Sequence, residues 1–220
     1  MAKVNLVLAG VAARIRHLGG PSKITKRSRP SSSIRVLQFY SKSKDADDLG
    51  IGLKDWRKRL SNFHSCKIEI DGRCYPSVEH AFHASKARCS DRPEIARTFE
   101  CGGSVGSNPA AAKTAGGKGG FKKQHATLDQ AQWDRVRDAE TTKALRARAR
   151  ADAEFCSILR ATAAHNVHLL HFERQAGKAY WGGAVDATGT IVGRNRLGEL
   201  LMELREELNA GAGAEAAKVR

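Results

Sequence analysis

A carboxylate, two imidazoles and an ammonium lie close together along one expected helix. Glu79, His83 and Lys86 are spaced i, i+4 and i+7, which places them on one helical face, and His80 directly follows Glu79. A carboxylate in such a cluster can accept a proton from water or stabilise a positive charge that develops during a reaction. Ordinary surface helices show the same polar face, so the spacing alone leaves both a functional site and a solvated surface open.

A short β-ribbon is expected to deliver the chain to this helix. Asp71-Gly72 stands between two alternating segments, and this dipeptide favours a two-residue hairpin turn because both positions tolerate positive φ. Pro76 suits the first turn of a helix, where no N–H is needed, and Ser77 can cap the free N–H groups. The helix that follows should bury an apolar stripe made of Val78, Ala81, Phe82 and Ser85.

Helical patterns account for most of the remaining chain. Asn108-Pro109 can begin a short helix that carries Lys113, and the glycine-rich run 116–120 is either a phosphate cradle or a surface loop. The pattern Thr127-x-x-Gln130 predicts a capped helix that extends to about residue 150. Further helices are expected near residues 153–164 and 196–208. We therefore expect a mainly α, single helical domain with a small β-hairpin element.

Length, hydropathy and cysteine usage bound the class of protein. The 220 residues, of which 41% are hydrophobic, suffice for one domain of about 170–180 residues with tails. No apolar run reaches the roughly 18–20 residues that a membrane span needs, so we expect no membrane association. The five cysteines are an odd number without a Cys-x-x-Cys pair. This usage indicates reduced thiols in an intracellular compartment rather than a disulfide framework.

Metal binding and thiol catalysis are both disfavoured by the motifs. His80 and His83 could join Cys74 or Cys89 around zinc, but the chain has no His-Glu-x-x-His motif and no close cysteine pair to complete a tetrahedron. No recognisable motif couples a cysteine nucleophile to a histidine base. We therefore expect no metal site, and histidines that bond the backbone or line a pocket.

The net charge of +15 is concentrated near the N-terminus. Residues 1–44 contain ten Lys or Arg and no acidic residue, so the remainder carries only 28 − 23 = +5. Residues 1–35 have the composition of an organelle transit peptide, and equally of a flexible basic segment that could contact nucleic acid. The protein is accordingly expected in the cytoplasm, or in an organelle if residues 1–35 are a transit peptide. Residues 209–220, rich in Gly and Ala, are expected to form a disordered tail.

Several short motifs occur in a specific order along residues 36–208. They are Phe39-Tyr40, Leu60-Ser61-Asn62-Phe63, Ile70-Asp71-Gly72, Tyr75-Pro76-Ser77-Val78-Glu79-His80, Lys86, Tyr180-Trp181-Gly182, Gly193-Arg194-Asn195-Arg196-Leu197-Gly198 and Leu200-Leu201-Met202-Glu203-Leu204-Arg205. In this order they resemble the YbiA-like, or NADAR, family. The resemblance implies a mainly helical N-glycosidase that needs no cofactor beyond water. Its members hydrolyse riboflavin-pathway ribosylamino-pyrimidine phosphates or remove ADP-ribose from guanine, so a small ribosyl phosphate or ADP-ribosyl substrate is implied.

Residue chemistry and the resemblance together nominate the site. Glu79, in the Pro-Ser-x-Glu-His motif, is the implied catalytic carboxylate, with Glu173 as a candidate second acid and Trp133 as an aromatic wall of the catalytic site. Candidate substrate-binding residues are Asn62, His80, Lys86, Lys113, Trp181 and Asn195. Alternatives remain for several of these, because an asparagine can fix a loop or cap a helix, a lysine can be merely solvated, and a helical tryptophan is often core.

The chain departs from the family pattern around Trp181. The family commonly reads Asp-x-x-Trp-Gly-Asp-Gly there, whereas this chain has Lys178 and Gly183 in place of both acids. Asp186 or Glu173 could restore the missing charge, and Lys178 with Arg194 would favour phosphates or ADP-ribose. Lys113 replaces the arginine usual near its position, which keeps the charge but loses a bidentate donor.

Two other function classes therefore stand beside the hydrolase. One is a catalytically impaired protein that binds ADP-ribose or a nucleotide without turnover. The other is a nucleic-acid-associated protein recruited by its basic leader, whose affinity should fall steeply with salt.

Overall fold

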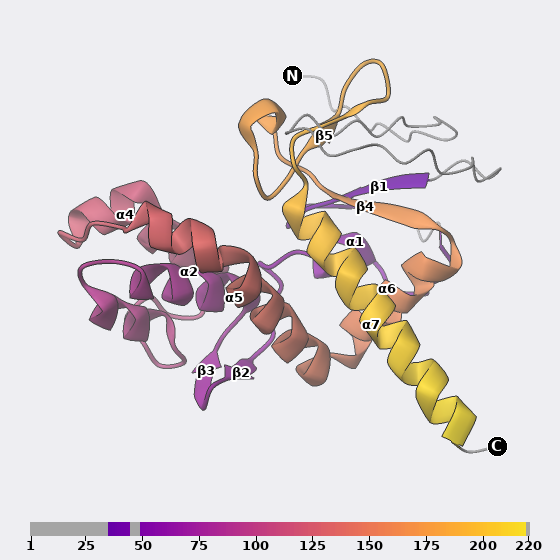
Figure 1. Ribbon diagram of the computed structural model, residues 1–220, viewed down its shortest axis with the longest axis horizontal. Helices are drawn as coiled ribbons and strands as arrows, with labels where there is room; N and C mark the ends of the chain where they lie inside the picture. The colour runs from indigo at the N-terminus through magenta and orange to yellow at the C-terminus, as the bar shows by residue number, and fades with distance from the viewer. Residues whose placement is uncertain (1–34, 45–48, 219–220) are drawn as a thin grey trace.

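The computed structural model describes residues 35–44 and 49–218 (Figure 1). The predicted basic leader therefore lies outside the described residues except for Arg35, which begins strand β1. No helix in the described ranges combines the length and the apolar character that a membrane crossing requires.

The described chain is mainly helical, as predicted. The α-helices are α1 (Trp56–Arg59), α2 (Val78–Arg88), α3 (Pro109–Ala115), α4 (Lys118–Lys123), α5 (Gln130–Ala151), α6 (Ala153–Ala164) and α7 (Arg196–Lys218). Two 3₁₀ helices, η1 (Pro93–Phe99) and η2 (Ala176–Lys178), join them. The strands are β1 (Arg35–Phe39), β2 (Ile68–Ile70), β3 (Arg73–Tyr75), β4 (Val167–His171), β5 (Ala184–Val185) and β6 (Ile191–Val192).

The hairpin before helix α2 is confirmed. Strands β2 and β3 pair in antiparallel register with Ile70 opposite Arg73, and both Asp71 and Gly72 have positive φ, at 51° and 72°. Ser77 caps α2 by accepting a hydrogen bond from the backbone N–H of His80. The chain therefore passes from a tight turn into the helix that carries Glu79.

Two further strand pairs were not predicted. Strand β1 lies parallel to β4, so that Phe39 stands opposite His171, although more than 120 residues separate them in the sequence. Leu37, Phe39 and Leu169 turn from this pair into the core. Strands β5 and β6 form a second small antiparallel pair. The β content is thus larger than the single hairpin that the local patterns indicated.

Three helix boundaries differ from the predictions. Helix α5 is capped by Asp129, whose side chain accepts from Gln132 N–H, and not by Thr127. The glycine run 116–120 is not a surface loop, since Gly117 is the N-cap of the short helix α4. Helix α7 continues to Lys218, past the end predicted at residue 208, because Ala, Glu and Lys in this segment are strong helix formers. Residues 209–218 are therefore helical, where a disordered tail was expected.

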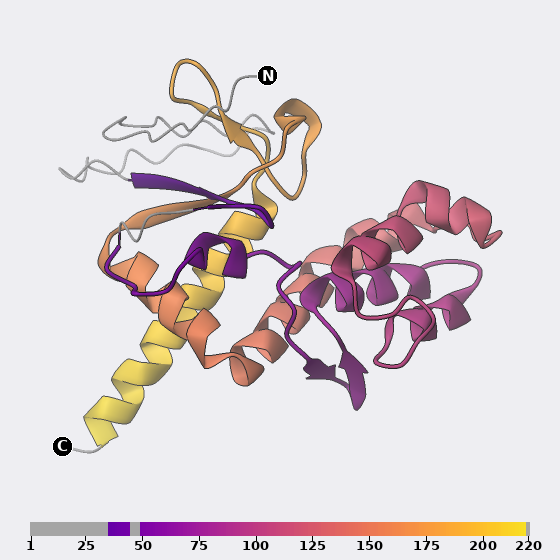
Figure 2. The same cartoon turned by 180° about the vertical axis from the view of Figure 1, so that it is seen from behind.

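The helices enclose one core and leave two ends that the long helix α5 connects. Figures 1 and 2 show α2, α3 and α4 beside the first turns of α5 at one end, and α6 and α7 below the β1–β4 pair at the other. Trp56, Tyr75, Phe155 and Leu201 are among the fully buried core side chains. Glu79 lies in the first turn of α2.

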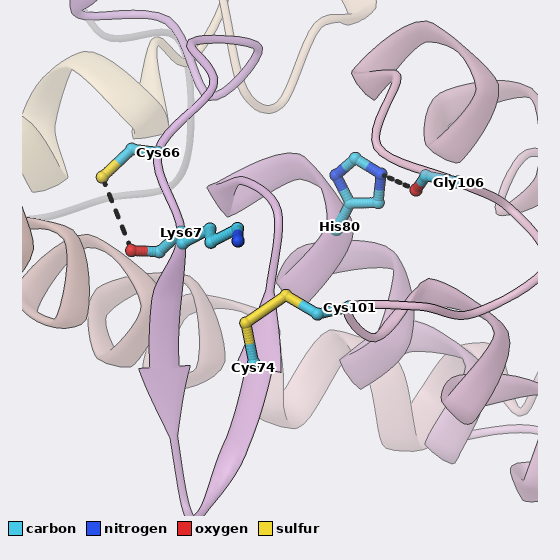
Figure 3. Close-up of a disulfide and its surroundings, with 6 residues drawn as sticks. All are labelled: Cys66, Lys67, Cys74, His80, Cys101 and Gly106. Carbon is cyan, nitrogen blue, oxygen red and sulfur yellow. Dashed lines mark hydrogen bonds between the residues drawn. A yellow bond between two sulfur atoms is a disulfide. The ribbon is translucent and has the colours of Figure 1, made fainter.

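The prediction that all cysteines are reduced is wrong for two of the five. Cys74 on β3 and Cys101, which follows η1, form a disulfide across 27 residues (Figure 3). The hydrogen bond from Cys101 N–H to Cys74 O, at 2.8 Å, aligns the two segments. The pairing could not be read from spacing, because it depends on η1 folding back beside the hairpin. Cys66, Cys89 and Cys156 are free thiols.

Reduction of this disulfide should lower stability without unfolding the domain. Closing a loop of this length stabilises a protein by about 3–4 kcal/mol in the chain-entropy model. We expect the Cys74→Ser variant, or wild type in dithiothreitol, to show a clearly lower midpoint in thermal denaturation. Cys66→Ser is the matched control, since that thiol lies outside the bond. Equal midpoints for the oxidised and reduced protein would contradict the prediction.

Candidate functional site

Glu79 lies in the first turn of α2, almost fully buried, beside the segment 60–63. Its backbone N–H donates to Asn62 O at 3.1 Å, which fixes the two motifs side by side. The Asn62 Oδ1 atom is buried and has no hydrogen-bond partner among the described residues. A buried acceptor without a partner is costly, so this oxygen is a natural contact for a ligand hydroxyl or amine. The structure thus brings together Asn62 and Glu79, two of the nominated site residues.

The segment 60–63 is itself held by a buried arginine. Arg148 on α5 has no exposed surface and donates from Nη1 to Ser61 O at 3.1 Å and from Nη2 to Arg59 O. Its charge is balanced by Asp152, whose Oδ2 lies 3.2 Å from Nη2. This role could not be predicted from the sequence, because Arg148 stands in a run of alternating arginines that is typical of a solvent-exposed helix.

Three aromatic rings meet at Phe82, which lies one turn after Glu79 on α2. The Phe82 ring lies edge-to-face with Trp133, at 5.1 Å between centroids, and with Trp181, at 5.3 Å. Trp133 is buried, whereas Trp181 is partly exposed. These tryptophans come from α5 and from the loop before β5, so the fold unites three distant segments in one aromatic wall.

Trp181 is anchored through its neighbour Tyr180. Tyr180 Oη donates to Asp138 Oδ1 at 2.7 Å, and Asp138 Oδ2 accepts from Arg196 at 2.7 Å. The guanidinium of Arg137 stacks on the Tyr180 ring at 3.5 Å. Burial and the Asp138 contact raise the pKa of Tyr180, so its hydroxyl remains a donor.

The two lysines nominated for substrate binding have different surroundings. Lys113 on α3 is exposed, and its ammonium lies 5.6 Å from the Phe63 ring centroid, beside the segment that contains Asn62. Lys86 is half-buried; it donates to Gly116 O at 3.1 Å and lies over the Phe121 ring. Burial lowers the pKa of Lys86. Lys113 is therefore the cation that is open to a ligand, while Lys86 is engaged within the protein.

His80 and Asn195 are also engaged within the protein. His80 is fully buried, with Nδ1 2.8 Å from Ser77 Oγ and Nε2 3.0 Å from Gly106 O, a contact visible in Figure 3. Asn195 Oδ1 accepts from His171 N–H at 2.9 Å, and Nδ2 donates to Leu169 O at 2.8 Å. Both residues were nominated as substrate-binding, and their polar atoms already have protein partners. They hold α2 and β4 in place.

His171 is a residue of this region that sequence reasoning missed. It ends strand β4, close enough to Glu79 and Lys113 for their charges to act on it, and its ring packs 5.4 Å from Phe39. Burial lowers the pKa of His171 to about 4, against the opposing effects of a hydrogen bond to the Trp181 backbone and of the Glu79 charge. The His171 imidazole, which is hydrogen-bonded to the Trp181 backbone, is therefore neutral at neutral pH.

Lys178, one of the two departures from the family pattern, lines a cavity. A cavity of about 570 Å³ is lined by Arg174, Gln175, Ala176, Gly177, Lys178, Ala184, Asp186 and Val192. Asp186 Oδ1 accepts from Thr188 and Thr190 within its own turn, so this carboxylate is already used. Glu173 is exposed and lies against Gly182, and no contact joins it to Glu79 in the described structure. Arg194 stacks on Tyr180, 5.5 Å from the ring centroid.

Gly183 is fixed by packing in this segment. A Cβ at this position would lie 2.5 Å from Val192 O, so no aspartate can occupy it without moving β6.

The part of the chain that is described contains no group of three or more His, Cys, Asp or Glu side chains placed to hold a metal ion.

The low pKa of His171 predicts a loss of stability in acid. The His171 side chain takes up a proton near pH 6.5 in the unfolded chain, but only near pH 4 in the folded chain. The contribution of the neutral His171 to the free energy of unfolding is therefore complete above pH 6.5 and is lost as the pH falls towards 4. The loss amounts to about 3 kcal/mol. Chemical denaturation of wild type and His171→Leu between pH 7.5 and 4.5 should show a flatter dependence in the variant. The exposed His165→Leu should match wild type, and parallel curves for His171→Leu would refute the prediction.

Comparison with known proteins identifies the family. The NADAR domain model matches residues 39–209. The N-glycosidase YbiA of Escherichia coli (strain K12) and that of Shigella boydii serotype 4 (strain Sb227) are each 33% identical to this chain over 174 residues, which are 79% of this chain and 88% of the relative. The NMR structure of the E. coli protein YbiA superimposes with a TM-score of 0.56 at 30% identity and covers 81% of this chain and 87% of that one. The order of motifs, the mainly helical fold and these matches agree, and the chain belongs to the NADAR family.

Proposed function

We propose that this protein is an N-glycosidase that hydrolyses the bond between C1 of a phosphorylated ribose and a nitrogen. The observation that carries the proposal is Glu79, a buried carboxylate one turn before Phe82 on α2, where the Phe82 ring meets Trp133 and Trp181. The relatives named N-glycosidase support the reaction class. The substrate is a ribosylamino-pyrimidine phosphate or an ADP-ribosylated base.

The residues fit the demands of this reaction. Cleavage of a ribosyl C1–N bond passes through an oxocarbenium-like centre, which an adjacent carboxylate stabilises. Glu79 would face that centre or accept the proton of the attacking water, whose hydroxyl adds to C1 while the released nitrogen gains a proton. The indoles would stack on the leaving base and exclude bulk water. Lys113 would bind a phosphate, and Asn62 Oδ1 a ribose hydroxyl.

An impaired binder is the second candidate, and one observation favours it. Gly183 and Lys178 stand where the family commonly has aspartates, and packing against Val192 leaves no room for a side chain at Gly183. One candidate replacement, Asp186, is held in its own turn. If the family's second carboxylate is indispensable, this chain would bind the ligand and release nothing.

Product analysis separates the two candidates. The protein would be purified from an E. coli host that lacks its own YbiA, because E. coli strain K12 has an N-glycosidase of this family. It would be incubated with a ribosylamino-pyrimidine phosphate and with an ADP-ribosylated guanine oligonucleotide, and ribose 5-phosphate and ADP-ribose would be followed by mass spectrometry. Release of either product supports the hydrolase and names the substrate. Ligand binding by calorimetry without any product would support the impaired binder.

A further inference from the structure

The Glu79 carboxylate has one partner side chain in the described structure. His83, one turn further along α2, places Nε2 3.1 Å from Glu79 Oε1, and the two side chains are only 6% and 11% exposed. A carboxylate only accepts hydrogen bonds, so Nε2 carries the proton and donates it. Glu79 Oε2 has no protein partner among the described residues. One oxygen is thus fixed and the other is left for a ligand.

The far side of the His83 ring is closed by Gly116. The Nδ1 atom is buried without a hydrogen-bond partner in the described chain, and the Gly116 backbone packs against it. A Cβ at position 116 would overlap the ring and lie 2.6 Å from His83 Cβ. The φ of Gly116 is −88°, which any residue can adopt. Glycine is therefore required here because a side chain would overlap the His83 ring, and not because of the backbone conformation.

Neighbouring side chains restrict the His83 ring on its other sides. Lys86 donates to Gly116 O at 3.1 Å and so holds the backing segment against α2. The Phe82 ring meets His83 edge-on at 5.0 Å, and the Phe99 ring stacks at 6.1 Å. The packing around the His83 imidazole therefore prevents the ring from moving away from Glu79 and from rotating out of the hydrogen bond.

We propose that His83 is a positioning residue that holds the Glu79 carboxylate in its reactive orientation, with Gly116 and Lys86 as its support. This inference rests on the proposed function, because it assigns Glu79 to the chemistry. A carboxylate that must face C1 loses rate when its angle or distance changes, and misplacement by about 1 Å can cost 100-fold. His83 does not touch substrate, so its loss should alter kcat and leave KM nearly unchanged.

Matched variants test the assignment. His83→Gln keeps an N–H donor towards Glu79 and should retain kcat within about 3-fold, whereas His83→Leu should lose about 10–100-fold in kcat with KM within about 3-fold. Gly116→Ala should resemble His83→Leu, because the new methyl group displaces the ring. Gly119→Ala, which adds a methyl group in open space on α4, should equal wild type.

The outcomes separate failure of the inference from failure of the proposed function. Unchanged kcat in a folded His83→Leu, or equal loss in His83→Gln and His83→Leu, would overturn the inference. If His83→Leu does not fold, the kcat of Gly116→Ala is compared with that of Gly119→Ala. Equal kcat values for these two variants would overturn the inference. If wild type releases no product, the proposed function fails, and ¹⁵N-edited NMR then tests the contact directly. An imidazole Hε2 proton of His83 that exchanges slowly in wild type, and rapidly in Glu79→Ala, would support it; rapid exchange in both would refute it.

Discussion

Replacing Glu79 by Gln should strongly reduce turnover while the protein remains folded. The amide has the size of the carboxylate and can still accept a hydrogen bond from His83, so the surroundings keep their shape. It carries no charge and accepts no proton, so the rate of C1–N cleavage should fall by about 10²–10⁴-fold. Single-turnover assays on whichever substrate wild type cleaves would measure this loss, with the thermal midpoint as the test of folding.

Two other carboxylates provide the comparison. Glu69→Gln changes an exposed residue of β2 and should leave the rate at the wild-type value. Glu173→Gln tests whether the exposed acid beside Gly182 supplies the charge lost at Lys178 and Gly183. A wild-type rate in Glu79→Gln, together with a large loss in Glu173→Gln, would transfer the catalytic role to Glu173.

Local signals were enough to predict the element that carries Glu79. The Asp71-Gly72 turn and the Ser77 cap act over a few residues, and the structure confirms both. The N-cap residue of α5 was harder to predict from the sequence, because Thr127 and Asp129 both suit a helix start. The choice between them depends on tertiary contacts. Thr127 N–H is taken by Asp91 Oδ1 at 2.7 Å, which leaves Asp129 to cap the helix.

Contacts between distant segments could not be predicted from the sequence. The β1–β4 pair places Phe39 opposite His171, and neither strand has a signal that points to the other. The sequence alone therefore could not place His171 near Glu79. The Cys74–Cys101 bond, with Cα atoms 5.4 Å apart, likewise depends on the path of η1. The engagement of Lys86 by Gly116 has the same origin, since the sequence could not show which group its ammonium meets.

Arg148→Met should destabilise the protein more than any other single change considered above, apart from changes to the disulfide. The guanidinium is fully buried and bonds Ser61 O, Arg59 O and Asp152, and it lies over the Phe155 ring at 4.1 Å. Methionine fills much of the space but leaves two carbonyls and a carboxylate without their donor. Removing one partner of a buried charged network costs about 3–5 kcal/mol. Urea denaturation should show this loss as a lower midpoint with an unchanged m-value.

The same variant should weaken the site, because Arg148 fixes the segment that contains Asn62. If the variant is folded at low temperature, its KM should rise more than its kcat falls, since Asn62 is assigned to binding and Glu79 to the chemistry. Arg150→Met is the matched control: it removes a charge from the same helix at an exposed position and should change neither quantity. Equal stability of Arg148→Met and Arg150→Met would show that the buried guanidinium only balances its own desolvation, as some buried ion pairs do.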